Sequence, residues 1–317
     1  MSDESRRDLD TAIRLALSRT RAGDLAFPAH FSGLRYDEVG DGACRLHLSA
    51  QPQVLDASGA FANMPVAMAC DISLSSAIRS TVKSTVGKEI RLPTVSLELE
   101  FLRAPIRAEA LMLHSRFGHR IGNLATAETE VRTAAGECLI RARGRFVVTG
   151  SPPGQGLVCY PWDTDLAAIP LTSGLTAAET QAHAFLLSDD RDTRAPRCYD
   201  EFYRIDTIVS EDGRARLRQP IGPHLANRSG IVQGGVIAGL LTDACLAAAR
   251  SRDASLTTLL SSGCTYLRPV TLDKAFLFAG ATVLLVGRRV ACVSVEASDD
   301  QNTLLARGEA LFATAPE

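Results

Sequence analysis

No apolar run in the 317-residue sequence is long enough to cross a membrane, and the polar segment Met1 to Asp8 lacks the apolar core of a signal peptide. Basic and acidic residues nearly balance, with 34 Lys and Arg against 36 Asp and Glu. Clustered arginines such as Arg141, Arg143 and Arg145 alternate with apolar residues, which is typical of the solvated face of a strand. We therefore expect a cytoplasmic protein that binds neither nucleic acid nor a membrane.

Signals for metals, disulfides and common catalytic loops are also missing. The eight cysteines occur singly, mostly inside apolar runs and without a Cys-x-x-Cys pair, which indicates buried thiols. His114 and His119 have no acidic or cysteine partner at the spacing of a metal site. The sequence contains no Gly-x-Ser-x-Gly elbow, no Walker motif and no Gly-x-Gly-x-x-Gly loop. We expect no metal and no bound cofactor.

An internal repeat is the strongest positive signal in the sequence. At an offset of 171 positions, residues 41–80 align without a gap with residues 212–251, and 11 of the 40 pairs are identical. Two long repeats are too few for a solenoid, so we predict a pseudo-symmetric pair of units. The match resumes where Phe101-Leu102-Arg103 aligns with Tyr266-Leu267-Arg268, and it ends where Ala142-Arg143-Gly144 aligns with Ala306-Arg307-Gly308.

Both repeats predict the same order of elements: a strand, a loop rich in Pro and Gly, one long helix and several further strands. The helices are expected at Met64–Val82 and Gly235–Arg252, which are dense in Ala and Leu and have no Pro beyond the first turn. One helix with about five mostly antiparallel strands forms an α+β unit whose sheet curls around the helix. The expected strands are Ala43–Ser49, Thr94–Leu102, Glu109–Phe117, Leu124–Arg132 and Glu137–Val148, then Arg214–Gln219, Leu259–Leu267, Ala275–Leu285, Val290–Ala297 and Thr303–Thr314.

A segment dense in Pro and Gly between the repeats marks the boundary between the units. We predict a first unit at residues 1–150, a linker at 151–175 and a second unit at 176–317. The stretch Arg6–Arg21 combines paired charges with spaced apolar residues and predicts a surface helix. Its partner in the second unit is expected to begin after Thr176, with Glu179 completing a capping box.

The segment His224-Leu225-Ala226-Asn227-Arg228-Ser229-Gly230-Ile231-Val232-Gln233-Gly234-Gly235 resembles a loop of the hot-dog-fold thioesterases of the phenylacetate-pathway type. In that family the loop reads His-x-x-Asn-x-x-Gly-x-x-His-Gly-Gly and opens the central helix; here Gln233 replaces the second His. Tyr266-Leu267-Arg268-Pro269 and Ala306-Arg307-Gly308 are also similar to the family. The resemblance covers residues 40–148 and 212–314. It implies two tandem hot-dog units, each a curved antiparallel sheet wrapped round a central helix, paired as a pseudo-dimer.

The resemblance also implies that one unit supplies the loop of a site and the other unit supplies a carboxylate from its central helix. The family carries this acid nine residues after the position of Gln233, where the second unit has Thr242. Asp243 lies one residue later, about 100° around the helix. The first unit has Asp71 at the equivalent position, with Ser75 one turn further along the same face. The predicted result is one composite site, whereas the reciprocal set is expected to be degenerate (Asp56, Ala62, Thr242 and Leu246).

Thioester hydrolysis needs a polarised carbonyl, an activated water and a place for the developing oxyanion. The Gly234 N–H is the predicted oxyanion donor, because a helix N-terminus carries fixed positive charge and glycine permits close approach. Asp71 follows apolar residues that favour its protonated form, and it would act as general base or as a nucleophile forming an anhydride. The remaining expected site residues orient the water or thioester (Ser75, Asn227 and Gln233) or contact substrate (His224, Gly230 and Gly235).

The resulting prediction is an acyl-CoA thioesterase-like hydrolase that cleaves an acyl-CoA or acyl-carrier thioester at one site per chain, and we expect it to form a homo-oligomer. Two other functions remain open. The replacement of His by Gln233 permits an acyl-CoA-binding protein without turnover. A hot-dog hydratase or dehydratase is the other alternative, although its Asp and His five residues apart are not found here. Asp243 remains a rival to Asp71 as the acid.

Overall fold

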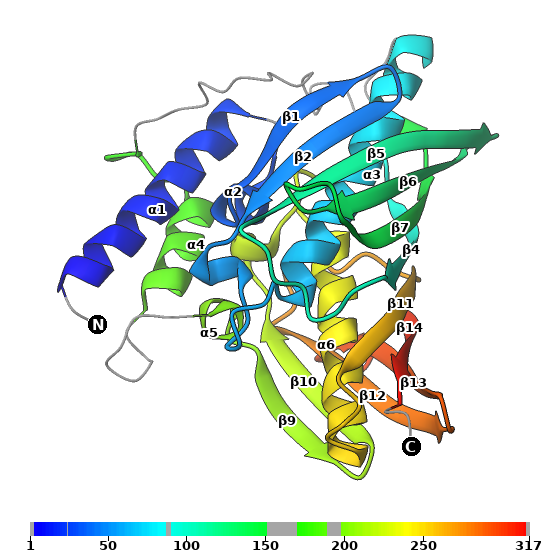
Figure 1. Cartoon of the computed structure of the whole chain (residues 1–317). Helices are drawn as coiled ribbons and strands as arrows, with labels where there is room; N and C mark the ends of the chain where they lie inside the picture. The colour runs from blue at the N-terminus through cyan, green and yellow to red at the C-terminus, as the bar shows by residue number, and fades with distance from the viewer. Residues whose placement is uncertain (1–2, 24, 87–89, 151–169, 189–197, 315–317) are drawn as a thin grey trace.

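The computed structural model describes residues 3–23, 25–86, 90–150, 170–188 and 198–314, which form two similar units side by side (Figure 1). Each unit wraps a curved antiparallel sheet round one long helix, α3 (Asn63–Val86) in the first unit and α6 (Gly234–Arg252) in the second. The predicted α+β architecture of two paired units is therefore confirmed.

The strands of the two units correspond one to one. The first unit contains β1 (Leu34–Gly40), β2 (Ala43–Ser49), β4 (Thr94–Phe101), β5 (Ala110–Ile121), β6 (Leu124–Arg132) and β7 (Cys138–Val147). The second contains β9 (Asp206–Glu211), β10 (Arg214–Pro220), β11 (Thr258–Tyr266), β12 (Phe276–Val286), β13 (Val290–Asp299) and β14 (Leu304–Ala313). A separate pair is formed by β3 (Ile90–Arg91) and β8 (Thr149–Gly150).

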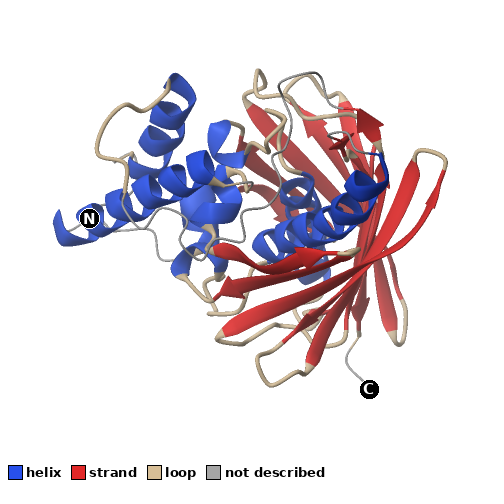
Figure 2. Cartoon of the chain, turned by 90° about the horizontal axis from the view of Figure 1, so that it is seen from above, coloured by secondary structure: helices blue, strands red, loops and turns tan. Residues whose placement is uncertain are grey.

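The two sets of strands join into one 12-stranded sheet with the order β1-β2-β5-β6-β7-β4-β11-β14-β13-β12-β10-β9. The second half of this order repeats the first half in reverse, as a twofold axis between β4 and β11 requires. These two strands pair antiparallel, with Ser261 opposite Glu100 and Thr265 opposite Ser96. Figure 2 shows the continuous sheet curving round the helices. The central helices therefore share one interior.

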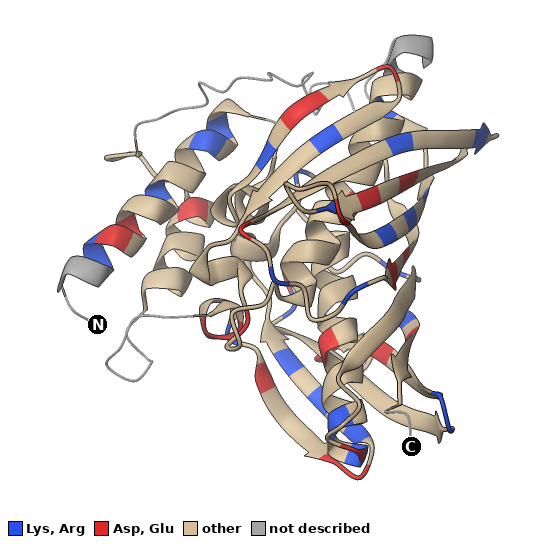
Figure 3. Ribbon diagram, viewed as in Figure 1, with Lys and Arg blue, Asp and Glu red and all other residues tan. Residues whose placement is uncertain are grey.

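Side chains alternate between the two faces of the sheet as the sequence predicts. In β7, Ala142 and Phe146 are buried against the helix side, whereas the three arginines predicted to face solvent are exposed. Arg143 pairs with Glu128 at 2.6 Å and Arg145 with Glu98 at 2.5 Å, across to neighbouring strands. Figure 3 shows these alternating charges along the strands. The charged side chains thus lie on the solvent face of the sheet, where exposed cross-strand ion pairs contribute little to stability.

The two central helices touch backbone to backbone, and two glycines of α6 make this contact possible. A Cβ atom on Gly239 would overlap the Cα of Met64, and one on Gly235 would overlap the Cα of Met68. Met64 precedes Met68 in α3, whereas its partner Gly239 follows Gly235 in α6. The two helices therefore run antiparallel at the contact. The repeat offset of 171 places Gly235 at the position of Met64 and Gly239 at that of Met68. The two contacts are therefore related by the pseudo-twofold axis, and in each one a methionine of α3 meets a glycine of α6.

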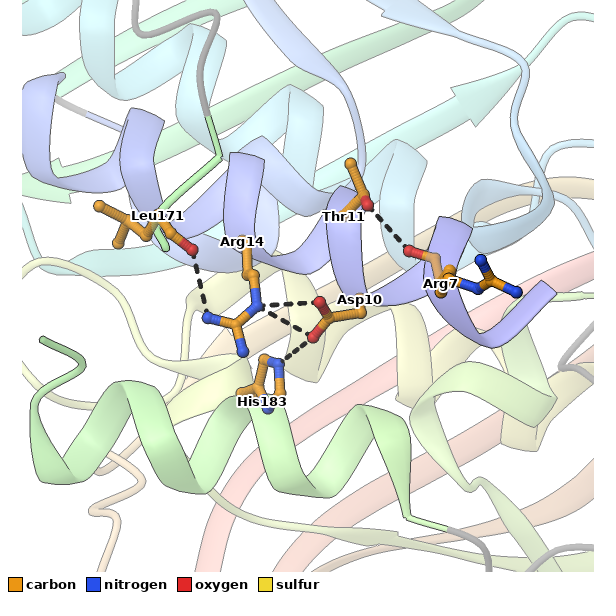
Figure 4. Close-up of polar contacts among 6 residues, drawn as sticks. All are labelled: Arg7, Asp10, Thr11, Arg14, Leu171 and His183. Atoms are coloured by element: carbon orange, nitrogen blue, oxygen red, sulfur yellow. Dashed lines mark hydrogen bonds and ion pairs between the residues drawn. The ribbon is translucent and has the colours of Figure 1, made fainter. Parts of the chain in front are cut away.

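Two further helices, α1 (Asp3–Ala22) and α4 (Ala177–Leu187), lie together beside the sheet (Figure 1). Asp10 accepts hydrogen bonds from Arg14 and lies 2.6 Å from Nε2 of His183 on α4 (Figure 4). Arg21 at the end of α1 pairs with Glu179 at 2.5 Å. Thr176 and Glu179 form the predicted capping box. The predicted N-terminal helix and its partner are confirmed, and their contacts fasten the first unit to the second.

The structure adds elements that the sequence did not predict. Each unit has six strands in the large sheet because β1 and β9 extend its edges, and short helices precede them at α2 (Phe27–Phe31) and α5 (Tyr199–Tyr203). Most of the predicted linker, residues 151–169, lies outside the described residues, so the domain boundaries stay a prediction. Among the described residues, no helix has both the length and the apolar character needed to cross a membrane.

Replacing Gly239 by Ala should destabilise the protein by about 2 kcal/mol, because the added methyl group would force the two central helices apart and overpacking costs more than the helix propensity of Ala returns. Urea unfolding measures the change. Gly280→Ala is the matched control, since a Cβ there meets nothing within 4 Å. Equal stability of the two variants would contradict the close helix contact.

Candidate functional site

A cavity of about 550 Å³ lies between the two units and is lined by both of them. Five residues predicted for the site line it together: Asp71, Ser75, Asn227, Gln233 and Gly234. The helix α3 supplies the first two, and the loop before α6 with the first residue of α6 supplies the others. The structure thus brings the first-unit carboxylate to the second-unit loop, as the composite arrangement requires.

The Asp71 carboxylate is the buried centre of this cavity, with only 5% of the residue exposed. Its Oδ2 atom accepts a hydrogen bond of 2.7 Å from Nε2 of Gln233. Its Oδ1 atom accepts one of 2.8 Å from the hydroxyl of Thr94, and the backbone N–H of Gly235 donates to the same carboxylate. Three donors from two segments, the first residue of β4 and the start of α6, therefore fix the position of this carboxylate.

Burial dominates the ionisation of Asp71. Removal from water raises the pKa of Asp71 to about 6, while the hydrogen bonds from Thr94, Gln233 and Gly235 act in the opposite direction by stabilising the charged form. At pH 7 the group is therefore mostly ionised, yet it is a stronger base than an exposed aspartate. This is the range in which a carboxylate exchanges protons with bound water efficiently.

The first turn of α6 leaves one amide for a ligand. Gln233 caps the helix by accepting from the Val236 N–H at 3.2 Å, and the Gly235 N–H donates to Asp71. Gly234 is the first helical residue, so its N–H has no acceptor within the helix, and no described residue accepts from it. A Cβ at Gly234 would lie 3.2 Å from both Asp71 and Thr94 side-chain oxygens, so glycine keeps this corner open.

Three other predicted residues do not line the cavity: His224 and Gly235 are buried, and Gly230 is exposed. His224 is 1% exposed and stacks on Phe185 with ring centroids 3.7 Å apart. Gly235 packs against the Met68 backbone, which accounts for the second glycine of the pair. Gly230 has a φ of +73°, the left-handed conformation of a turn. None of the three is among the cavity-lining residues of the described chain.

Asn227 and Ser75 line the cavity but also have local partners. The Asn227 Oδ1 atom accepts from the Ser229 N–H at 2.8 Å, closing a turn in the loop. The same turn occurs in the first unit, where Asp56 accepts from the Ser58 N–H at 2.8 Å. Ser75 donates to the Ile72 carbonyl at 3.0 Å, which leaves its oxygen lone pairs available as acceptors.

The sequence reasoning missed two residues that hold the site together. Thr94, the first residue of β4, donates to Asp71, and nothing in its local sequence marks it. Tyr266 at the end of β11 donates to the Gly234 carbonyl at 2.8 Å and so steadies the start of α6. The one sequence signal that could have pointed to Tyr266 is its place in the Tyr-Leu-Arg-Pro segment, which is similar to the family. The cavity wall also carries four arginines: Arg79, Arg91, Arg228 and Arg268.

Asp243, the rival acid, lies elsewhere. It lines a second cavity with Asn63, whose Nδ2 atom donates to Asp243 Oδ1 at 2.7 Å. The hydroxyl of Thr242, the residue that aligns with Asp71, donates a hydrogen bond of 2.9 Å to the Ala238 carbonyl. Within the described parts of the chain, no group of three or more His, Cys, Asp or Glu side chains is arranged to hold a metal ion.

Comparisons with known proteins bear on the fold and on part of the second unit. Residues 229–306, from the loop through α6 to the start of β14, match the family described as the thioesterase superfamily. No curated protein matches the sequence significantly.

Solved structures match most of the chain at low identity. An acyl-CoA thioesterase II from Mycobacterium marinum is 13% identical with a TM-score of 0.51, covering 89% of this chain and 96% of that one. The tesB protein of Mycobacterium avium subs paratuberculosis is 13% identical with a TM-score of 0.53 and the same coverages of 89% and 96%. A protein with a hot-dog fold from Alicyclobacillus acidocaldarius is 12% identical with a TM-score of 0.55, covering 90% and 96%.

At this level of identity the structures establish the fold, and residues 229–306 are similar to the thioesterase superfamily. The resemblance to the hot-dog-fold thioesterases is confirmed: the chain is a double hot-dog protein whose second unit matches the thioesterase superfamily.

Proposed function

We propose that this protein hydrolyses acyl-CoA thioesters at a single composite site, the cavity in which Asp71 of the first unit meets the Gln233-Gly234 loop of the second. The observation that carries the proposal is the placement of a buried, basic carboxylate beside an unused amide at a helix N-terminus. A general base and an oxyanion donor are the two groups that thioester hydrolysis needs from a protein.

In the proposed reaction the thioester carbonyl oxygen accepts a hydrogen bond from the Gly234 N–H. The positive end of α6 stabilises the negative charge that develops on this oxygen. Asp71 takes a proton from water, whose oxygen attacks the carbonyl carbon. The tetrahedral intermediate then expels the thiolate, which receives the proton from Asp71. The products are the free acid and the CoA thiol, and the Asp71 carboxylate is regenerated.

Water activation is favoured over direct attack by Asp71. Both carboxylate oxygens already accept hydrogen bonds, from Thr94 and Gln233, which lowers their nucleophilicity and holds them in place. Ser75 lines the same cavity one turn further along α3, where its oxygen can accept a hydrogen bond from the attacking water. Gln233 supports the geometry as helix cap and donor, two roles that do not require a titratable side chain.

The charges around the cavity favour CoA as the carrier. Four arginines and one buried carboxylate line it, which suits a substrate that carries several phosphate charges. Arg228 and Arg268 are exposed, and each is held by one guanidinium nitrogen that donates to backbone carbonyls. We propose that their other nitrogens contact a carrier that remains partly in solvent. Localisation in the cytoplasm and assembly into a homo-oligomer stay part of the proposal.

Replacing Asp71 by Asn should lower kcat/KM for acyl-CoA hydrolysis by about 10²- to 10⁴-fold, the contribution of a positioned general base. Thiol release from short-chain, long-chain and aromatic acyl-CoAs measures the effect. Asp253→Asn, an exposed aspartate at the end of α6, is the matched control and should keep wild-type rates.

Two results would contradict this assignment. Wild-type turnover by Asp71→Asn would show that another group activates the water, with Asp243 the next acid to test. Tight binding of acyl-CoA by the wild type without release of thiol from any substrate would favour the binding protein without turnover.

Replacing Thr94 by Val should move the acidic limb of the pH profile to higher pH. The Thr94 hydroxyl lowers the pKa of Asp71 by stabilising the carboxylate, so its loss raises that pKa above about 6. Hydrolysis needs the ionised form, and kcat/KM should therefore fall at pH 6 while the rate at high pH changes less. Thr282→Val, at an exposed strand position, serves as the control. A uniform loss of rate at every pH would argue against this electrostatic role.

Replacing Arg268 by Gln should raise KM for acyl-CoA several-fold and leave kcat nearly unchanged. The expected change corresponds to the loss of one exposed charge contact of about 1 kcal/mol. The same variant should leave KM for an N-acetylcysteamine thioester unchanged, because that substrate lacks the phosphates. Arg289→Gln, in the exposed β12–β13 turn, is the matched control. An equal effect on both substrates would place Arg268 near the acyl group.

A further inference from the structure

A second cavity of about 320 Å³ lies where the internal repeat would place a second copy of the first one. The first-unit loop around Asp56 and Ala62 lines it from one side, and Asp243 and Leu246 of α6 line it from the other. Tyr199 from the short helix α5 completes the wall. The reciprocal pairing that the sequence predicts to be degenerate therefore still encloses a cavity of ligand size.

Two residues that line this cavity each carry a buried polar atom without a partner. The Oδ2 atom of Asp243 and the hydroxyl of Tyr199 are both buried, and neither has a hydrogen-bond partner among the described residues. Tyr199 is 1% exposed, and both residues line the cavity. Leaving such groups unsatisfied is unfavourable, and a polar ligand would supply the missing hydrogen bonds.

The second cavity lacks the features that support hydrolysis in the first. Asn63 occupies the position of Gly234, and its side chain donates to Asp243 at 2.7 Å. Pro65 occupies the position of Val236 and has no N–H. The first turn of α3 therefore presents neither the open glycine corner nor the same set of amides, and this cavity is not an equivalent thioester site.

The charge around the second cavity is the reverse of that around the first. Three carboxylates line it, from Asp56, Asp200 and Asp243, against the single cation Arg250. A phosphate-bearing carrier such as CoA would be repelled here. The rest of the wall combines three polar side chains, Asn63, Thr207 and Thr257, with apolar ones. The phenylalanine rings among the apolar side chains also attract cations through their faces. The apolar side chains include Phe61, Phe101, Ile106, Leu217 and Leu259.

We propose that the second cavity binds a small organic cation, an ammonium group on an apolar body, with Asp243 and the Tyr199 hydroxyl as its polar partners. The ammonium group donates to the open Oδ2 atom of Asp243 and to the Tyr199 oxygen, and the apolar body packs against the surrounding wall. This site is independent of the proposed hydrolysis, because none of its residues lines the first cavity.

Binding at this site depends on pH. Burial raises the pKa of Asp243 to about 8, and the neighbouring Asp200 and Asp56 add to the rise, whereas Asn63 and Arg250 lower it. Ligand-free Asp243 is therefore mostly protonated at pH 7, and a bound cation favours its ionised form. Affinity for the cation should increase as the pH rises from 6.5 to 8, by up to about tenfold per pH unit, because less work is needed to remove the proton.

Isothermal titration of the full-length protein with hexylammonium chloride, hexan-1-ol and sodium hexanoate tests the site, since the three probes share one chain and differ in charge. Hexylammonium should bind at least about tenfold more tightly than the alcohol, and hexanoate should bind most weakly. Asp243→Asn keeps the side-chain shape and should remove both the preference for the cation and the pH dependence. Tyr199→Phe removes only the hydroxyl and should weaken binding several-fold.

Asp71→Asn locates the binding, because it changes the other cavity and should leave hexylammonium affinity unchanged. Equal affinity for the three probes, unchanged binding in Asp243→Asn, or loss of binding in Asp71→Asn would each overturn the proposal. Loss of thioester hydrolysis in Asp243→Asn together with full hydrolysis in Asp71→Asn would instead make the second cavity the hydrolytic site. Failure of hydrolysis alone, with hexylammonium binding retained, would count only against the proposed enzymatic function.

Discussion

The close antiparallel contact between α3 and α6 is the constraint on which the candidate site depends. Gly235 and Gly239 allow the two backbones to meet at Met68 and Met64, and Asp71 lies one turn beyond Met68. At this separation the Gly235 amide reaches the Asp71 carboxylate, and Gln233 reaches it from the cap of α6. A side chain at either glycine would widen the gap and break these hydrogen bonds, so packing and site geometry have the same cause.

The fold was predictable from the sequence wherever local pattern and burial agree. The central helices were found because they are dense in Ala and Leu with no Pro beyond the first turn, and the inner strands because their apolar residues follow a two-residue period. The edge strand β9 was missed because all six of its residues are exposed, so it has no buried face to mark it. The helices α2 and α5 have five residues each, too few for a periodic signal. These elements are ordered by tertiary contacts rather than by local preference.

The candidate site was predictable in part, for a related reason. The repeat offset aligned Asp71 with Thr242, and this asymmetry indicated a composite arrangement. Thr94 and Tyr266 come from strands whose sequences carry no sign of the contact, because only the sheet brings them to the start of α6. Gly235 was assigned to substrate by its place in a motif, whereas the structure gives it a packing contact. The shape of the second cavity could not be read from the sequence at all.

Covalent fusion changes how such a site assembles. In a pair of separate subunits, the half-site with the loop and the half-site with the acid meet only as often as the protein concentration allows. In this chain the two halves are permanently tethered, so their encounter is intramolecular and its equilibrium does not change on dilution. Each half also folds from its own stretch of sequence, so a substitution alters one cavity and leaves its counterpart untouched. Two unlike cavities can therefore coexist in one molecule, which an exchangeable pair of identical subunits could not maintain.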